Sequence, residues 1–200
     1  MKKNIISFML ITAAMSAYGG NMDASLWTAQ DSTITFLSSK INKQLNSITE
    51  QSSFTANKSQ LDAEGNFTMN IDLSSVKTNI GLRDQRLKDW VFETGQFANA
   101  EISGKVEMSA INKLQEGEAI SLQQPLLINI HGKKINFNAN LSIQRNMNNK
   151  ITVSTRTPVI LDIKQMGMTE GVARMVEVMG LSSIVEQVPV SFDGIFTRNY

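Results

Sequence analysis

Histidine and cysteine, the side chains that most often serve as nucleophiles, general bases and metal ligands, are scarce in this sequence. The 200 residues include one histidine, His131, and no cysteine. Disulfides, thiol catalysis, zinc thiolate sites and iron–sulfur clusters are therefore excluded, and a lone histidine cannot build a histidine-rich metal site. His131 could activate a serine, but no G-x-S-x-G motif occurs. Because Gly132 follows it, we interpret His131 as a solvent-facing residue of a hairpin turn.

The acidic stretch 62–66 resembles the beginning of a calcium-binding loop. Gly65 comes one position too early for the glycine of such a loop, however, and Leu73 occupies the position of its final bidentate glutamate. We therefore predict a turn between two strands. The phosphate-binding motifs G-x-x-x-x-G-K-[ST] and G-x-G-x-x-G do not occur either. We predict no catalytic residues, no metal, no cofactor and no enzymatic activity. A cryptic lipid hydrolase that depends on His131 is kept as one alternative hypothesis, beside the two that are given at the end of this section.

Residues 1–19 have the features of a secretory signal peptide. Lys2 and Lys3 precede an apolar run over 5–15, and Ala17 and Gly19 stand at −3 and −1 of a cleavage site. The apolar run is shorter than the ~20 residues that span a bilayer, so we expect no stable membrane insertion. The sequence therefore predicts a periplasmic or secreted protein with a single domain over 20–200.

The charge balance gives the protein no electrostatic reason to bind nucleic acid. The chain has 19 basic and 18 acidic residues, and loss of two lysines with the signal peptide leaves a charge of about −1. We expect no nucleic-acid partner. The composition, 42% hydrophobic and 18% charged, is typical of a folded domain with a substantial core.

Apolar and polar residues alternate along most of the domain, which is the pattern of strands with one buried face. The alternation is clearest over 67–73, 135–143 and 188–196. Pro158 predicts a break in the strand that begins at Ile151. The predicted strands cover 32–38, 54–61, 67–73, 102–108, 126–131, 135–144, 151–155 and 188–197.

Two segments, 83–92 and 169–179, have the spacing of apolar residues that is typical of helices. We expect Thr169 to cap the second helix and Gly180 to end it. Each helix could be a flexible lid over a ligand or a permanent cover of the sheet. The apolar stripes consist of Leu87, Trp90 and Val91 in the first helix and of Val172, Met175, Val176 and Met179 in the second.

About eight predicted strands and two short helices favour an all-β fold. We predict an antiparallel β-barrel, with the two helices near the barrel ends. Closure of the sheet leaves no exposed edge and turns each apolar face inward. A β-sandwich would also bury one face of each strand. The interior combines large residues with small ones at Gly104, Ala139 and Gly194, and we expect the small ones to leave room. From the residues alone, a ligand cavity and a filled core are both compatible with this interior.

The order of motifs over 25–197 resembles the YceI-like family, whose members are lipid- or polyisoprenoid-binding proteins with a lipocalin-like barrel. The most specific part is the segment 71–78, Ile-Asp-Leu-Ser-Ser-Val-Lys-Thr, followed by Arg83-Asp84. The resemblance implies that a strand also lies within 37–53. The single residues Leu87, Phe92 and Phe97 continue this segment. Further similar motifs are Asp31-Ser32-x-Ile34-x-Phe36, His131-Gly132-Lys133, Arg156-Thr157-Pro158-Val159, Gly180-Leu181-x-Ser183-Ile184 and Val188-Pro189-Val190-x-Phe192.

The resemblance implies that the barrel holds a long isoprenoid-like chain. Burial of each CH₂ contributes ~0.8 kcal/mol, so we expect selectivity to follow the tail more than the headgroup. Arg83-Asp84 could bind a headgroup or only fix its loop. We predict these ligand-binding residues: Ile34, Phe36, Phe67, Met69, Ile71, Leu87, Trp90, Phe92, Ile128, Phe137, Ala139, Leu141, Met175, Met179 and Phe192.

The sequence and the resemblance together predict an exported carrier or scavenger of an amphiphile with a long apolar tail. The expected partner is a hydrophobic small molecule: a polyprenyl lipid, an isoprenoid quinone or a fatty-acid derivative. The alternative is a barrel with a filled core that acts through its surface, as an envelope-stress or partner-binding protein. Whether the protein forms a homodimer is left open.

Overall fold

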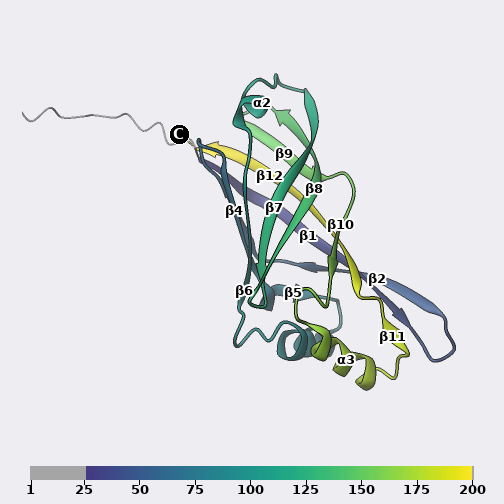
Figure 1. Cartoon of the computed structure of the whole chain (residues 1–200). Helices are drawn as coiled ribbons and strands as arrows, with labels where there is room; N and C mark the ends of the chain where they lie inside the picture. The colour runs from purple at the N-terminus through teal and green to yellow at the C-terminus, as the bar shows by residue number, and fades with distance from the viewer. Residues whose placement is uncertain (1–25, 200) are drawn as a thin grey trace, which may run out of the picture.

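The computed structural model describes residues 26–199, in which antiparallel strands form a closed barrel (Figure 1). The strands of the closed circuit are β1 (Leu26–Ile41), β3 (Asn57–Leu61), β4 (Asn66–Asp72), β6 (Asn99–Lys105), β7 (Ala119–Ile130), β8 (Lys133–Asn146), β9 (Lys150–Thr155) and β12 (Gln187–Asn199). The circuit closes because β12 pairs with β1, from Leu26↔Asn199 to Phe36↔Val190. This closure confirms the predicted eight-stranded barrel and excludes the sandwich. Residues 1–19, the predicted signal peptide, lie outside the described residues.

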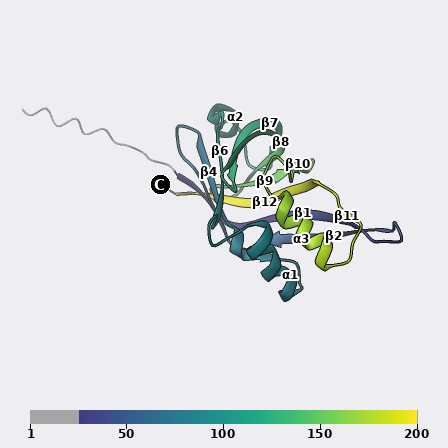
Figure 2. The ribbon, with the colours of Figure 1, turned by 60° about the horizontal axis from the view of Figure 1, so that its bottom comes forward.

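The remaining strands lengthen or border the circuit. β2 (Ser47–Phe54) precedes β3 and pairs with the second half of β1, and β10 (Val159–Asp162) continues β9 along β12. Pro158 lies in the break between β9 and β10, as predicted. The short strands β5 (Val76–Lys77) and β11 (Ser183–Ile184) pair with β2 and β1. The hairpin of β1 and β2 extends beyond the barrel wall (Figures 1 and 2).

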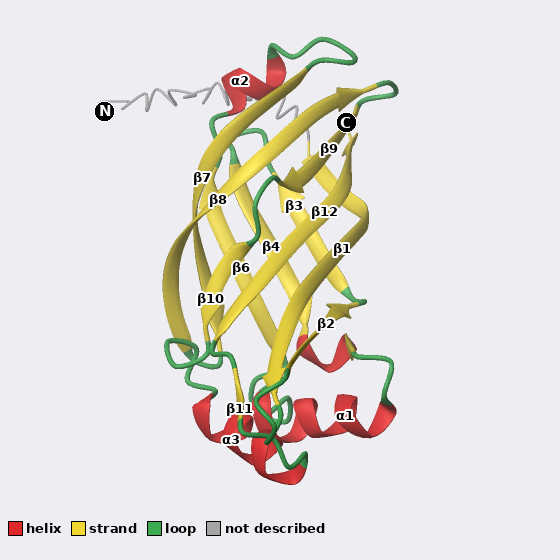
Figure 3. Ribbon diagram, turned by 90° about the vertical axis from the view of Figure 1, so that its right-hand side faces the viewer, coloured by secondary structure: helices red, strands yellow, loops and turns green. Residues whose placement is uncertain are grey.

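Helices cover both ends of the barrel (Figure 3). α1 (Gly81–Arg86), the π-helical η2 (Leu87–Val91) and α3 (Thr169–Val178) lie at one end, called here the helical end. α2 (Met108–Asn112) lies at the opposite end, and the 3₁₀ turn η1 (Leu73–Ser75) follows β4. No helix within 26–199 is long and apolar enough to cross a bilayer.

Two local predictions are wrong. The strand predicted to reach Met108 ends at Lys105, because the carboxylate of Glu107 accepts a hydrogen bond from the Ser109 N–H and begins α2 there. Thr169 does not cap α3: it is the first helical residue, and Met168 holds the cap position without a side-chain hydrogen bond.

Two apolar clusters fill much of the barrel. The smaller one lies beside α2 and centres on Trp27, which is 0% exposed, with Ile111 and Ile151. The larger one extends to the helical end and includes Met69 and Met175. The predicted turn at 62–66 is confirmed: Asp62 Oδ1 accepts a hydrogen bond of 2.7 Å from the backbone N–H of Asn66.

Candidate ligand-binding cavity

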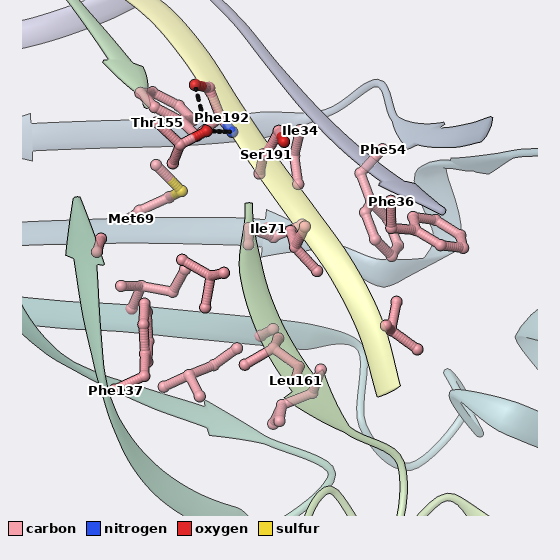
Figure 4. Close-up of a pocket in the computed structure, with 18 of the residues that line it drawn as sticks. Ile34, Phe36, Phe54, Met69, Ile71, Phe137, Thr155, Leu161, Ser191 and Phe192 are labelled. Atoms are coloured by element: carbon pink, nitrogen blue, oxygen red, sulfur yellow. Dashed lines mark hydrogen bonds between the residues drawn. The ribbon is translucent and has the colours of Figure 1, made fainter. Parts of the chain in front are cut away.

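A cavity of about 260 Å³ lies inside the barrel between the two ends. Inward-facing side chains of β1, β4, β8 and β12 form its walls, and aromatic and aliphatic residues from opposite strands face one another across it (Figure 4). Near the helical end the Phe54 ring contacts those of Phe36 and Phe92, with centroids 5.5 Å apart in each pair and the rings tilted by 34° and 60°. The lining is almost entirely apolar.

The structure places fourteen of the fifteen predicted ligand-binding residues on this cavity. They come from seven elements, so the barrel brings together residues that are distant in the sequence. Whether they contact a ligand stays a prediction. These fourteen are Ile34, Phe36, Phe67, Met69, Ile71, Leu87, Phe92, Ile128, Phe137, Ala139, Leu141, Met175, Met179 and Phe192.

Trp90 is the exception and does not line the cavity. The guanidinium groups of Arg86 and Arg174 both lie over its indole, each 5.6 Å from the ring centroid. The backbone of Trp90 also packs against Gly171 of α3, where a Cβ atom would lie 1.9 Å from the Trp90 carbonyl oxygen. Trp90 therefore joins η2 to α3 and packs against the larger apolar cluster without lining the cavity. Helical spacing alone does not distinguish cavity contacts from helix–helix contacts.

Small residues leave room in the barrel at only one of the three expected positions. Ala139 is 2% exposed and lines the cavity. A Cβ atom added at Gly104 would lie 2.6 Å from the Leu126 side chain, and one added at Gly194 would lie 2.6 Å from the Phe192 ring. These neighbouring side chains therefore occupy the space beside the two glycines. The expectation of free space at these two glycines is wrong.

Methionines concentrate where the barrel meets its helical cover. Met175 and Met179 were expected there, but Met166 and Met168 also line the cavity and are buried. They lie in the loop between β10 and α3, which has no periodicity from which their direction could be predicted. Methionine side chains adapt to irregular neighbours, so this part of the wall is the most easily reshaped.

Three charged residues, Lys40, Glu50 and Arg83, line the cavity at the helical end and are called here the charged cluster. The Lys40 ammonium and Arg83 Nη1 both contact the same carboxylate oxygen, Glu50 Oε2; the Arg83 distance is 2.7 Å. The side chains of Lys40 and Arg83 are 10% and 12% exposed, and that of Glu50 is 37% exposed. Burial, with a smaller contribution from the Arg83 charge, lowers the pKa of Lys40.

Thr78 and Asp84 hold Arg83 in place. Arg83 Nη2 donates a hydrogen bond of 2.8 Å to the Thr78 carbonyl oxygen. The Asp84 carboxylate accepts hydrogen bonds from the backbone N–H and the hydroxyl of Thr78. Asp84 therefore fixes the loop, whereas Arg83 reaches the cavity; the sequence alone left these two roles open for the pair.

His131 is not solvent-facing, contrary to the sequence-based interpretation. Its side chain is 11% exposed, its ring centroid lies 4.3 Å from that of Phe97, and its Nε2 lies 2.6 Å from Glu93 Oε2. It does stand in a hairpin turn, with φ of 50°. Between residues 26 and 199 no group of three histidine, cysteine, aspartate or glutamate residues is arranged to hold a metal ion.

The fold and the cavity together define a lipocalin-like barrel with an internal apolar space. The sequence matches the YceI-like domain over residues 26–196, so the chain belongs to this family. No match was found among curated proteins.

Solved structures share the fold. A polyisoprenoid-binding domain from Saccharophagus degradans, implicated in plant cell wall breakdown, is 24% identical, with a TM-score of 0.82 over 88% of this chain and 99% of that one. BcnA of Burkholderia cenocepacia is 15% identical, with a TM-score of 0.58 over 82% of this chain and 95% of that one. A mutant CJ YCEI protein made for nanotechnology applications is 14% identical, with a TM-score of 0.51 over 74% and 84%.

Proposed function

We propose that this protein is an exported carrier or scavenger that holds the apolar tail of an amphiphile inside its barrel. The observation that carries the proposal is the apolar cavity, which runs from the Trp27 cluster to the charged cluster at the helical end. Folded proteins keep interiors close-packed, and a wall of aromatic, aliphatic and methionine side chains around open space suits a hydrocarbon guest.

Two further observations support the proposal. The similar domain from Saccharophagus degradans is described as polyisoprenoid-binding, which makes a polyprenyl chain a good first ligand to test. An isoprenoid quinone or a fatty-acid derivative offers the same tail chemistry. Export rests on the signal-peptide features of residues 1–19.

The test is extraction of the purified protein with organic solvent, followed by mass spectrometry, in the wild type and two variants. Ala139→Trp places an indole in the cavity, whereas Asn138→Trp places the same group on the exposed face of the same strand. We expect an apolar molecule in near-equimolar amount from the wild type and Asn138→Trp, and none from Ala139→Trp.

Circular dichroism and the melting temperature establish that both variants are folded. Equal lipid content in the two variants would place the ligand outside the cavity. A clean extract from the wild type, with no uptake of added prenols, quinones or fatty acids, would favour the barrel that acts through its surface.

A further inference from the structure

The inward face of the hairpin formed by β1 and β2 changes from apolar to polar toward the helical end. Along β1 the cavity-lining residues are Ile34, Phe36, Ser38 and Lys40 in that order, and along β2 they are Phe54, Ser52 and Glu50. The two series run side by side, since Ile34 pairs with Phe54 and Ser38 with Glu50. A molecule lying along this wall would therefore meet an apolar surface at one end and charged groups at the other.

The charged cluster has more positive than negative charge. Two cations share a single carboxylate oxygen, and the carboxylate of Asp84, the neighbour of Arg83 in the sequence, is held by Thr78 and does not line the cavity. Arg83 Nε is buried and, within the described residues, has no hydrogen-bond acceptor. A buried donor without an acceptor is unfavourable unless a ligand or water supplies one.

The position of the cluster suits a headgroup and not a tail. Glu50 is partly exposed, whereas Lys40 and Arg83 are nearly buried, so the two cations are less accessible to solvent than the carboxylate that they share. A charge-assisted hydrogen bond in such a partly desolvated place is stronger than one on the open surface. An anion there would relieve both the excess positive charge and the unpaired Nε.

We propose that Lys40 and Arg83 bind the anionic headgroup, a phosphate or a carboxylate, of the amphiphile whose tail fills the barrel. This proposal rests on the proposed function and adds the headgroup class and its direction: the anion at the charged cluster, the tail toward Ala139. Selectivity then depends on the headgroup as well as the tail, in contrast to the expectation from the sequence alone.

Pairs of ligands with the same tail test the headgroup separately from the tail. Farnesyl phosphate is compared with farnesol, and dodecanoate with dodecanol, by displacement of a fluorescent lipid probe; inorganic phosphate is the tail-free control. We expect the wild type to prefer the anionic member of each pair by roughly tenfold or more. Inorganic phosphate should displace little probe, because it lacks the tail.

Three variants of the charged cluster and one control variant refine the test. Lys40→Met and Arg83→Met should reduce the preference for the anion to within about threefold, with little change for the alcohol. Glu50→Gln removes the competing carboxylate and should increase the preference, which a merely structural role of the cluster would not do. Lys164→Met breaks an exposed pair with Glu186 and serves as the control that leaves the preference unchanged.

The failures of the two proposals are distinguishable. Equal affinity for alcohol and anion in the wild type, or a preference unaltered in Lys40→Met and Glu50→Gln, overturns the headgroup site and leaves lipid binding intact. Tight binding of inorganic phosphate alone, without displacement by either alcohol, overturns both proposals. Because Arg83→Met removes a hydrogen bond to the Thr78 loop and could unfold it, Glu50→Gln and Lys40→Met decide the outcome if that variant is unstable.

Discussion

The volume of the cavity sets how much tail the resting barrel can hold, and a homologous series of straight-chain alcohols measures it. The cavity has about 260 Å³. A protein cavity of about 150 Å³ admits benzene, so this one holds on the order of ten carbons without rearrangement. Each CH₂ buried up to that length should add ~0.8 kcal/mol, about a fourfold gain in affinity per carbon.

Beyond about ten carbons the gain per carbon should fall to half or less, because further methylenes must displace side chains at the helical end. The methionines there can move, which permits longer tails at reduced gain. The assay is displacement of a fluorescent probe by alcohols of roughly six to sixteen carbons, each below its aggregation concentration; this range brackets the length that the volume predicts.

Comparison of Ala139→Trp with Asn138→Trp provides the internal control for this series. The buried indole of Ala139→Trp should shorten, by several carbons, the chain length at which the gain in affinity per carbon falls. The exposed indole of Asn138→Trp should leave that chain length unchanged. A fourfold gain per carbon that continues unbroken to the longest alcohol would refute the volume argument. No dependence on length would show that the tails do not enter the barrel.

Three further predictions concern stability. Gly171→Ala places a Cβ against the Trp90 carbonyl and should cost ~1–3 kcal/mol in urea unfolding; Gly95→Ala, with open space around it, should have little effect. Trp27→Ala empties a fully buried site and should cost ~3–5 kcal/mol, seen as a lower urea midpoint at unchanged slope. Burial lowers the pKa of Lys40 below its ordinary 10.5, so the folded state releases its proton first. The wild type should therefore gain stability relative to Lys40→Met as pH rises toward 10.5, and a loss over that range would contradict the assigned direction.

The strands with one apolar face were predictable because burial on one side imposes alternation. For β4, β8 and β12 the alternation also identified the cavity residues, since inward and apolar coincide along these strands. The hairpin of β1 and β2 shows where this coincidence ends. Ser38, Lys40 and Glu50 point inward, so the inward face is polar there and the sequence over 37–53 shows little hydrophobic periodicity.

Residue size was a poorer guide than residue direction. Gly104 and Gly194 could be placed on strands from the sequence, but whether they leave space depends on the side chains that cross them from neighbouring positions. Met166 and Met168 illustrate the converse: they line the cavity from a loop whose path depends on how α3 packs against η2. Both features are set by contacts between distant segments and leave no periodic signal.

The contacts that close the barrel differ between its two ends. At the end near α2, Trp27 and Ile111 are almost completely buried, so within 26–199 little of the apolar cluster at that end reaches the solvent. At the helical end α3 and η2 meet backbone to backbone at Gly171, which makes them one unit. β11, in contrast, is held to β1 by the pairs Lys40↔Ile184 and Ile41↔Ser183, and its Ile184 lines the cavity. The backbone N–H groups of Ser182 and Val185, which flank β11, also donate hydrogen bonds to the carbonyl oxygens of Ile41 and Ser39, so backbone contacts hold the wall beside Lys40 in place.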